Sequence, residues 1–279
     1  MNPKNAINAK NPKNAKNSTN STNSIPVVIL CGGMGTRLRE ETEYKPKPMV
    51  EIGGKPVLWH IMKLYAHFGF RRFILCLGYK GNVIKEYFVN YEAMSNDFTI
   101  NLGKGNHMAY QSKHTEQDFN VTLVDTGLKT MTGGRVKRIE KFIDTETFMV
   151  TYGDGLANIN INDLVAFHQG HGKLATLTAS RPPSRFGILE LTKENQVKQF
   201  REKVQTEWIN GGFLVFNRRV FDYLDSDCIL EREPMEKLTD EKQLMAFRHE
   251  GFWIGMDTYR EYEMLNQMWD TGNASWKVW

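Results

Sequence analysis

Cysteine is scarce in this chain of 279 residues, and long hydrophobic runs are missing. The three cysteines, Cys31, Cys76 and Cys228, are odd in number and show none of the paired spacings of a metal site or a disulfide framework. Free thiols in a reducing cytoplasm are the simplest interpretation. Because no apolar run approaches the roughly 20 residues that cross a bilayer, we expect a soluble, cytoplasmic protein with no membrane partner.

Signatures of nucleophilic and metal-centred catalysis are also missing. The seven histidines show no metal-ligand spacing, and His60 and His67 are better explained as packing or surface residues of a helix. No Gly-x-Ser-x-Gly elbow is present. The sequence therefore gives no sign of a serine or cysteine nucleophile.

Acidic residues are absent from residues 1–24, where asparagine recurs at every third position from Asn2 to Asn23. This low-complexity composition predicts a disordered tail ahead of a single domain at 25–279. The tail carries four lysines, so subtracting 4 from the formal net charge of +4 leaves the remainder near zero. Without a basic face on the folded part, or aromatics among the tail lysines, we expect no nucleic-acid partner.

The most informative segment is 25–49, where the apolar run I-P-V-V-I-L opens into C-G-G-M-G-T-R-L and then K-P-K-P-M. Glycines let a backbone turn sharply and bring its N–H groups against anionic oxygens. These glycines are Gly32, Gly33 and Gly35. Arg37 adds a planar fork of donors and Lys47 a point charge, which together favour phosphate binding. An ordinary strand-to-helix turn with solvated cations is the alternative.

Two better-known glycine loops do not fit this spacing. A dinucleotide fingerprint would need a small residue where Leu38 stands. A P-loop needs Gly-Lys-Ser/Thr after four variable residues, and no such string follows.

From Ile25 onward, apolar patterns typical of strands and helices alternate, which predicts an α/β fold with a largely parallel sheet. Strands are predicted at 27–30, 73–77, 98–102, 121–123, 148–152, 175–179, 187–191, 197–200 and 212–217. Helices are predicted at 57–68, 83–91, 161–169, 219–224 and 260–269. Ligands of open α/β sheets gather at the carboxyl ends of strands, where the glycine loop follows Leu30 and Asp154 follows Tyr152.

Two carboxylates come after apolar runs. Asp154 has glycine on either side, and Asp257 lies in F-W-I-G-M-D-T before a predicted helix. Magnesium prefers oxygen ligands and usually takes one or two carboxylates plus substrate phosphates. However, Asp257 also suits a helix N-cap and Asp154 a turn, and the sequence does not show that two positions 103 apart (257 minus 154) meet.

Longer strings resemble the sugar-phosphate nucleotidylyltransferases from Val27 to Trp279: L-C-G-G-M-G-T-R-L, K-P-K-P-M-V-E-I-G-G-K-P, T-Y-G-D-G, I-N-G-G-F and G-F-W-I-G-M-D-T. V-D-T-G, M-T-G-G-R and W-H-I-M-K are similar to the cytidylyl branch of that family. The resemblance implies a Rossmann-like, mixed but mainly parallel sheet flanked by helices. It also implies Mg²⁺-dependent transfer of CMP from CTP to glucose 1-phosphate, a homo-oligomer, and a role in O-antigen and lipopolysaccharide biosynthesis.

The resemblance further implies roles for individual residues. Nucleotide binding is implied for Leu30, Cys31, Gly32, Gly33, Met34, Gly35, Thr36, Arg37, Lys47, Thr130, Arg135 and Gly153. Catalysis is implied for Arg37, Lys47 and Asp154, and magnesium binding for Asp154 and Asp257. Binding of the sugar phosphate is implied for Lys203, Asn210, Gly211 and Gly212.

Two alternative functions stay open. A uridylyl- or thymidylyltransferase would have the same fold and use a different nucleotide base. The glycine loop alone does not identify the base. A site that hydrogen-bonds the edge of one base strongly rejects a base with a different edge. A nonenzymatic sugar-nucleotide-binding module usually lacks the loop cations or the metal ligand. The presence of Arg37, Lys47, Asp154 and Asp257 argues against such a module.

Overall fold

The computed structural model describes residues 25–35, 37–103, 107–111, 114–116, 118–182, 187–201 and 207–279. The tail predicted at residues 1–24 lies outside these ranges, as do two of the predicted site residues, Thr36 and Lys203.

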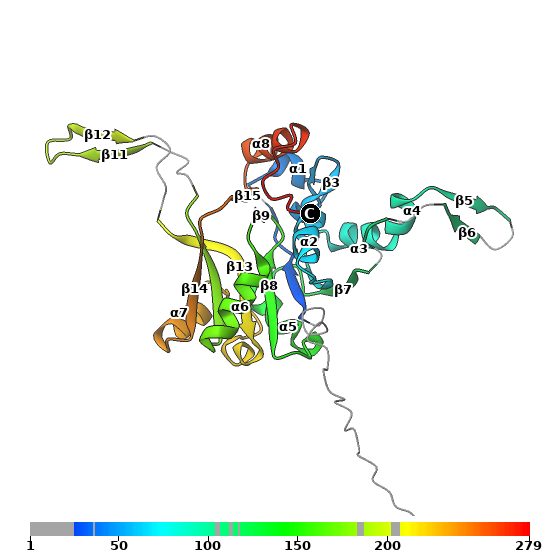
Figure 1. Ribbon diagram of the computed structural model, residues 1–279, viewed down its shortest axis with the longest axis horizontal. Coiled ribbons are helices and arrows are strands. Elements are labelled where there is room, and N and C mark those ends of the chain that lie inside the picture. The colour runs from blue at the N-terminus through cyan, green and yellow to red at the C-terminus, as the bar shows by residue number, and fades with distance from the viewer. Residues whose placement is uncertain are drawn as a thin grey trace, which may run out of the picture.

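Seven strands form the central sheet, in the order β14-β10-β13-β8-β1-β4-β7 (Figure 1). They are β1 (Val27–Leu30), β4 (Arg72–Leu77), β7 (Asn120–Asp125), β8 (Thr147–Tyr152), β10 (Ala175–Ser180), β13 (Ile209–Asn217) and β14 (Leu244–His249). Strand β1 pairs in parallel with β4 and β8, whereas β13 is antiparallel to its neighbours β8 and β10. The prediction of a mixed, mainly parallel sheet is confirmed.

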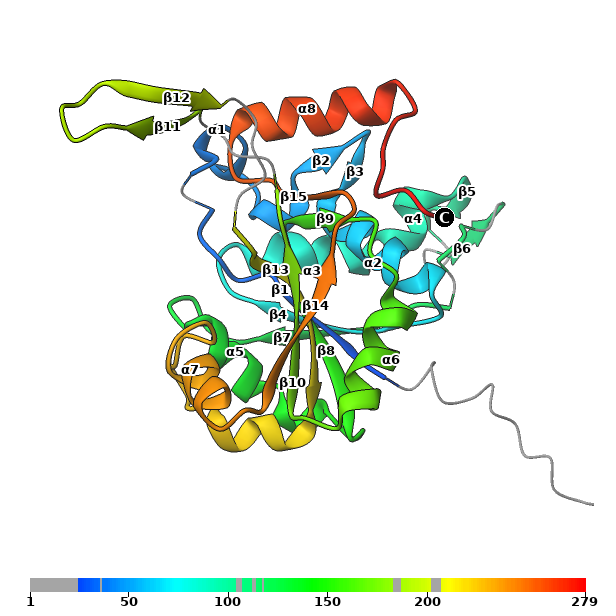
Figure 2. The same ribbon diagram turned by 60° about the vertical axis from the view of Figure 1, so that its left-hand side comes forward.

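Helices cover both faces of this sheet. On one side lie α2 (Val57–His67), α3 (Gly81–Val89) and α6 (Ile161–His171), and α8 (Tyr259–Asp270) lies above the end of the sheet (Figure 2). On the other lie α5 (Thr132–Arg138), the 3-10 helices η3 (Glu140–Phe142) and η4 (Arg218–Tyr223), and α7 (Glu233–Asp240), and Figure 2 separates α5 and α7 from α2 and α6. In β1, Val27 and Ile29 join the first core and Val28 and Leu30 the second, because successive strand residues face opposite sides.

Several elements were not predicted. Helix α5 contains two adjacent glycines, which disfavour a helix, and β14 lacks the β-branched residues typical of strands. The remaining short elements are α1 (Arg39–Thr42), η2 (Lys47–Met49), β2 (Glu51–Ile52), β3 (Lys55–Pro56), α4 (Tyr91–Ser95), β9 (Gly155–Ala157) and β15 (Trp253–Gly255).

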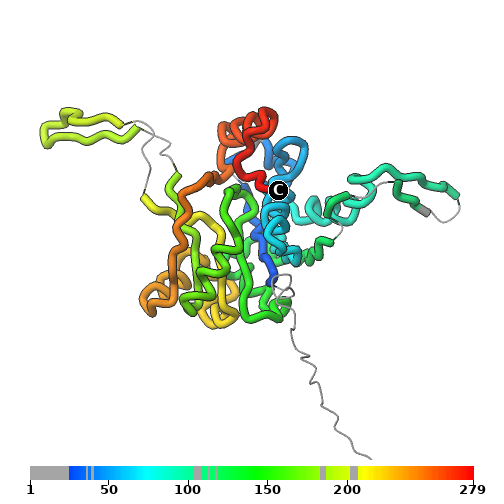
Figure 3. The backbone as a smooth tube through the Cα atoms, viewed as in Figure 1, coloured from blue at the N-terminus to red at the C-terminus, as the bar shows by residue number. Residues whose placement is uncertain are grey.

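Two hairpins extend from opposite sides of the body (Figures 1 and 3). They are β5–β6 (Phe98–Asn101 and His107–Tyr110) and β11–β12 (Ile188–Leu191 and Val197–Arg201). The strand predicted at 98–102 therefore exists but does not join the central sheet. Both hairpins carry exposed apolar side chains, such as Ile100 on the first and Phe200 on the second.

The C-terminal segment packs against α2. His60 on that helix is fully buried; its Nδ1 accepts a hydrogen bond from Trp276 Nε1 at 3.3 Å, and its Nε2 lies 2.9 Å from the Ile52 carbonyl oxygen. Burial lowers the pKa of His60 to about 4, so this imidazole is neutral near pH 7. The expectation that His60 is a packing residue is confirmed. Within the part of the chain that the structure describes, no helix has the length and hydropathy needed to span a membrane.

Candidate active site

A cluster of four charges lies at the carboxyl edge of the sheet. Lys47 Nζ lies 2.6 Å from Asp154 Oδ2 and 2.7 Å from Asp257 Oδ1. Arg37 Nη1 lies 3.0 Å from the other oxygen of Asp257. Two predicted cations and two predicted carboxylates thus meet, although their residues are spread over more than two hundred positions of the chain.

Short secondary structure explains how the two carboxylates meet. Asp154 follows β8 and directly precedes β9, and Asp257 comes two residues after β15. Strands β9 and β15 pair antiparallel with Gly155 opposite Gly255, and Met256 N donates to the Asp154 carbonyl at 3.0 Å. This pairing holds the two aspartates together independently of the ion pairs.

Asp257 is not the N-cap of the following helix. The N-cap of α8 is Thr258, which forms a capping box with Glu261. The Asp257 backbone N–H donates to Glu261 Oε2 at 2.7 Å, and its carboxylate accepts hydrogen bonds from Lys47 and Arg37. The interpretation of Asp257 as a simple cap is therefore wrong.

The environment of Lys47 keeps its ammonium charged. Its side chain is 11% exposed, and Lys47 begins the short helix η2, whose residues are buried. Burial by itself would lower the pKa of Lys47, but the charge of Asp154 and the hydrogen bonds to Asp154 and Asp257 outweigh burial and raise the pKa above its ordinary value. Near pH 7 the site therefore contains a fixed positive charge.

A pocket of about 330 Å³ opens beside this cluster. Its lining includes Asp154, predicted to be catalytic and to bind magnesium, and most of the predicted nucleotide-binding residues: Leu30, Cys31, Gly32, Gly33, Gly35, Arg37, Lys47, Thr130, Arg135 and Gly153. Met34 is exposed and does not line it. Four lining residues were not predicted: Pro48, Met131, Thr132 and Tyr152. All four lie in strings quoted above, which could have identified them: K-P-K-P-M, M-T-G-G-R and T-Y-G-D-G.

The glycine loop requires glycine for its shape. Gly35 has a φ of 64°, in the left-handed region that side chains disfavour, and its carbonyl accepts a hydrogen bond from Thr42 Oγ1 at 3.0 Å. Gly153 N donates to the Leu30 carbonyl at 3.1 Å, which joins the loop to the Asp154 turn. Burial strongly raises the pKa of the Cys31 thiol, so this cysteine is a packing group of the loop and not a nucleophile.

The segment predicted to bind the sugar reaches the same edge of the sheet from the opposite direction. Asn210, Gly211 and Gly212 lie near the start of β13, which runs antiparallel to β8. Asn210 Nδ2 lies 3.5 Å from the Tyr152 hydroxyl, which itself hydrogen-bonds Glu231. Nothing in the sequence around Glu231 identified it. Lys203 is outside the described residues, so its predicted contact with the sugar phosphate stays a prediction.

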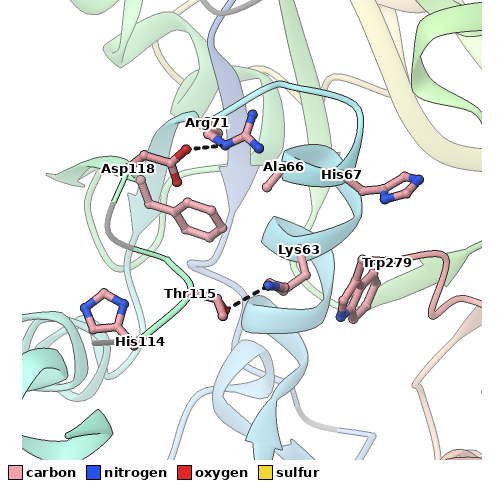
Figure 4. A pocket seen from close by; sticks show the side chains of 9 residues that line it. Lys63, Ala66, His67, Arg71, His114, Thr115, Asp118 and Trp279 are labelled. Carbon is pink, nitrogen blue, oxygen red and sulfur yellow. Dashed lines mark hydrogen bonds and ion pairs between the residues drawn. The ribbon is translucent and has the colours of Figure 1, made fainter. Parts of the chain in front are cut away.

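A second hollow, of about 420 Å³, lies elsewhere, beside α2, and includes none of the predicted site residues (Figure 4). Its cations already have partners: Lys63 Nζ donates to Thr115 Oγ1 at 3.2 Å, and Arg71 Nε lies 2.6 Å from Asp118 Oδ2. The 330 Å³ pocket, which has the charge cluster at its edge, is therefore the candidate active site. Its groups can bind a polyphosphate and a hard cation, and they include no obvious nucleophile.

Comparison with known proteins agrees with this geometry. The family model described as "Nucleotidyl transferase" matches residues 26–274. Glucose-1-phosphate cytidylyltransferase of Salmonella typhimurium is 52% identical over 256 residues, which cover 90% of this chain and 98% of that protein. A probable glucose-1-phosphate cytidylyltransferase of Bacillus subtilis is 45% identical over 255 residues, covering 90% of this chain and 99% of that protein.

A solved structure resembles the fold. The crystal structure of HddC from Yersinia pseudotuberculosis complexed with GMP-PN matches with a TM-score of 0.66 and 24% identity. The match covers 88% of this chain and 99% of that chain. At this identity the likeness concerns the fold alone, and it agrees with the mixed sheet described above.

Proposed function

The chain belongs to the nucleotidyl transferase family, and from that premise we propose that it is a glucose-1-phosphate cytidylyltransferase. It transfers CMP from CTP to α-D-glucose 1-phosphate and forms CDP-glucose and pyrophosphate. The observation that carries this proposal is the identity of more than half of the aligned residues with the Salmonella typhimurium protein of that name. The charge cluster beside a glycine-loop pocket supports the same chemistry.

The reaction needs no general base. Glucose 1-phosphate is already an anion near neutral pH, and one of its phosphate oxygens attacks the α-phosphorus of CTP in line. The bond between that phosphorus and the bridging oxygen of pyrophosphate breaks, and negative charge moves onto pyrophosphate. Such a transfer asks the protein mainly for positioning and charge stabilisation, which explains why the pocket contains fixed cations.

Arg37 and Lys47 have different parts in this proposal. Lys47 is nearly buried and fixed by two carboxylates, so its charge acts at a defined place. The Arg37 side chain is 72% exposed and ion-paired to Asp257 at the pocket edge, where its planar fork suits phosphate oxygens. Both side chains offset the charge that leaves with pyrophosphate.

The residues present fit a magnesium ion. Oxygens of Asp154 and Asp257 converge on one cationic atom, Lys47 Nζ, at 2.6 and 2.7 Å, so the two carboxylates already share one position for a cation. Carboxylate oxygens are hard ligands of the kind that Mg²⁺ takes, completed by substrate phosphates. Asp154 and Asp257 would hold the ion, which when bound would neutralise charge on the leaving group.

The test is pyrophosphate release by the purified full chain with glucose 1-phosphate and Mg²⁺. CTP, UTP, dTTP, ATP and GTP are offered in parallel, with a chelator control for each. Turnover with CTP that the chelator abolishes is the expected result. Turnover with UTP or dTTP instead would keep the mechanism and change the base, and absence of turnover with every nucleotide would favour a binding module.

We also propose that the chain forms a homo-oligomer through its projecting hairpins. The apolar side chains on β11–β12 include Leu189, Leu191, Val197 and Phe200, which are between 51% and 62% exposed. A second copy of the chain would cover them, and such cover reduces the aggregation risk of an exposed hairpin. Light scattering should give a multiple of the monomer mass, and Phe200→Asp should lower it. A monomeric wild type would contradict the proposal.

The location and pathway of the enzyme rest on the resemblance to the family. We place the reaction in the cytoplasm, where CTP and sugar phosphates are available. Its product would supply CDP-linked sugars for O-antigen and lipopolysaccharide. Deleting the gene should remove CDP-glucose from cell extracts and truncate the surface polysaccharide, and an unchanged CDP-glucose level would contradict this role.

A further inference from the structure

Arg135 lines the pocket, and its guanidinium group donates to backbone carbonyls. Its Nη1 lies 3.0 Å from the Leu77 oxygen and 2.8 Å from the Gly127 oxygen, and its Nη2 lies 3.1 Å from the Gly32 oxygen. Further contacts reach Thr126 Oγ1 at 2.7 Å and the Leu128 oxygen at 3.3 Å. Five acceptors thus surround two nitrogens that together have four N–H groups.

The Leu77, Gly32 and Gly127 carbonyls lie at or just after the carboxyl ends of three neighbouring strands. Leu77 ends β4, Gly32 follows β1, and Gly127 follows β7, and the three strands lie side by side in the sheet. All three are parallel, so their carboxyl ends meet at one edge. Arg135 therefore connects three neighbouring strand ends, and one of them is the start of the glycine loop that lines the pocket.

The glycines around Arg135 match this arrangement. A Cβ added to Gly32 would overlap the guanidinium group itself, and one added to Gly78 would lie 2.6 Å from Arg135 Nη1. Real Cβ atoms do not come so close to other heavy atoms, so side chains at these positions would displace the guanidinium. The first glycine of C-G-G-M-G-T-R-L is thus explained by the close approach of Arg135.

The helix that carries Arg135 is fixed in turn by the segment before α7. Gly134 N donates to the Cys228 carbonyl at 3.1 Å, and Leu230 N donates to Thr132 Oγ1 at 3.0 Å. A Cβ on Gly133 or Gly134 would collide with this segment. The two glycines of M-T-G-G-R therefore allow the helix to pack closely against this segment. That packing positions the Arg135 guanidinium at the edge of the sheet.

We propose that Arg135 is a positioning residue, which sets the conformation of the glycine loop for the nucleotide through its bond to the Gly32 carbonyl. This inference rests on the proposed function, and it differs from the direct nucleotide contact that the family resemblance implies for Arg135. The side chain is almost fully buried, because the residue is 5% exposed. Its donors are directed to carbonyl oxygens, and burial is tolerated because those dipoles solvate the charge.

Arg135→Lys separates the two roles, since lysine keeps the charge but loses the planar fork that reaches several carbonyls. The matched control is Arg138→Lys on the same helix, where Arg138 Nη1 donates to the Thr126 carbonyl at 2.8 Å and does not line the pocket. Three quantities are measured in the full chain: the hydrogen-exchange rate of the amides at 31–35, and KM and kcat with CTP.

In Arg135→Lys we expect exchange at 31–35 to rise about tenfold or more, KM for CTP to rise by a similar factor, and kcat to fall, because charge-assisted bonds to the loop are lost. Arg138→Lys should stay within about twofold of wild type in all three. Weaker CTP binding with unchanged exchange would mean that Arg135 contacts the nucleotide directly, and would overturn the proposal. Unchanged exchange and kinetics would overturn it as well.

Two further variants keep the test decisive if Arg135→Lys does not fold. Gly32→Ala disturbs the same contact from the loop side, whereas at Gly33 an added Cβ meets no atom within 4 Å. Exchange at 31–35 should rise in Gly32→Ala and much less in Gly33→Ala; equal effects would contradict the role of Arg135. Exchange is measured without substrate, so a wild type that failed to use CTP would refute the proposed function and leave this result standing.

Discussion

Replacing Lys47 with methionine removes the ammonium that Asp154 and Asp257 share at 2.6 and 2.7 Å and keeps much of the apolar stem. Breaking a fully buried ion pair costs about 3–5 kcal/mol, because the remaining charge loses its partner. The two carboxylate side chains are 32% and 21% exposed, so water recovers part of that cost and we expect a loss of about 2 kcal/mol. For a chain of this size the melting temperature should fall by about 4–8 °C.

Magnesium should act in the opposite direction on this variant. Without the ammonium, the oxygens of Asp154 and Asp257 that shared it repel each other, and only the exposed Arg37 still pairs with the other oxygen of Asp257. We expect MgCl₂, with no nucleotide present, to raise the melting temperature of Lys47→Met more than that of wild type. At ten times its Kd, a bound ion contributes about 1.4 kcal/mol. Turnover should nevertheless fall by about 10²–10³-fold, because the charge at the leaving group is lost.

Lys45→Met is the matched control for scanning fluorimetry. Lys45 Nζ lies 3.8 and 3.9 Å from its two glutamates, and its side chain is 30% exposed, so its loss should cost less than about 0.5 kcal/mol. The reasoning is wrong if Lys47→Met has the same melting temperature as wild type and MgCl₂ raises the melting temperature of both proteins equally. In that case the two aspartates do not share a cation position.

Three other groups give further predictions. Asp154→Asn should lower turnover by about 10²–10³-fold with unchanged circular dichroism, and near-normal turnover would contradict its metal role. Thr258→Ala should lower the free energy of unfolding by about 1 kcal/mol in urea titrations, because the α8 cap is lost, and no change would contradict the capping box. The pKa of His60 is depressed to about 4 from 6.5, so its contribution is complete above pH 6.5 and is lost as the pH falls toward 4; between pH 7 and pH 5 we expect a loss of about 2 kcal/mol. His60→Gln should flatten this pH profile and the exposed His67→Gln should not, and equal profiles would refute the assignment.

Most of the central sheet could be predicted because its strands are short, continuous apolar runs between turn residues. The strand at 27–30 matches β1 at both ends, and the helix at 57–68 differs from α2 by one residue. By contrast, β14 is hard to recognise because L-M-A-F-R-H has no alternation of apolar and polar residues. The pairing of β9 with β15 was out of reach, since three-residue strands have almost no pattern of their own.

The candidate site was predictable where chemistry is concentrated in a motif. Arg37, Lys47 and Asp154 stand in strings typical of the family, and the structure places them around one pocket. The sequence could not show which partners the side chains of the site contact. The burial of Arg135 against carbonyls and the contact of Tyr152 with Glu231 depend on segments brought together by the fold, and no local pattern records such distances.

The charge cluster draws on both ends of the folded chain, and this has a consequence for biosynthesis. Lys47 emerges early from the ribosome, whereas Asp257 and the Trp276 segment that packs on α2 emerge only after every strand of the central sheet. A nascent chain that stops before Asp257 has the glycine loop and both cations but only one of the two carboxylates. Termination just before Asp257 would therefore leave every strand of the central sheet in place and the charge cluster incomplete.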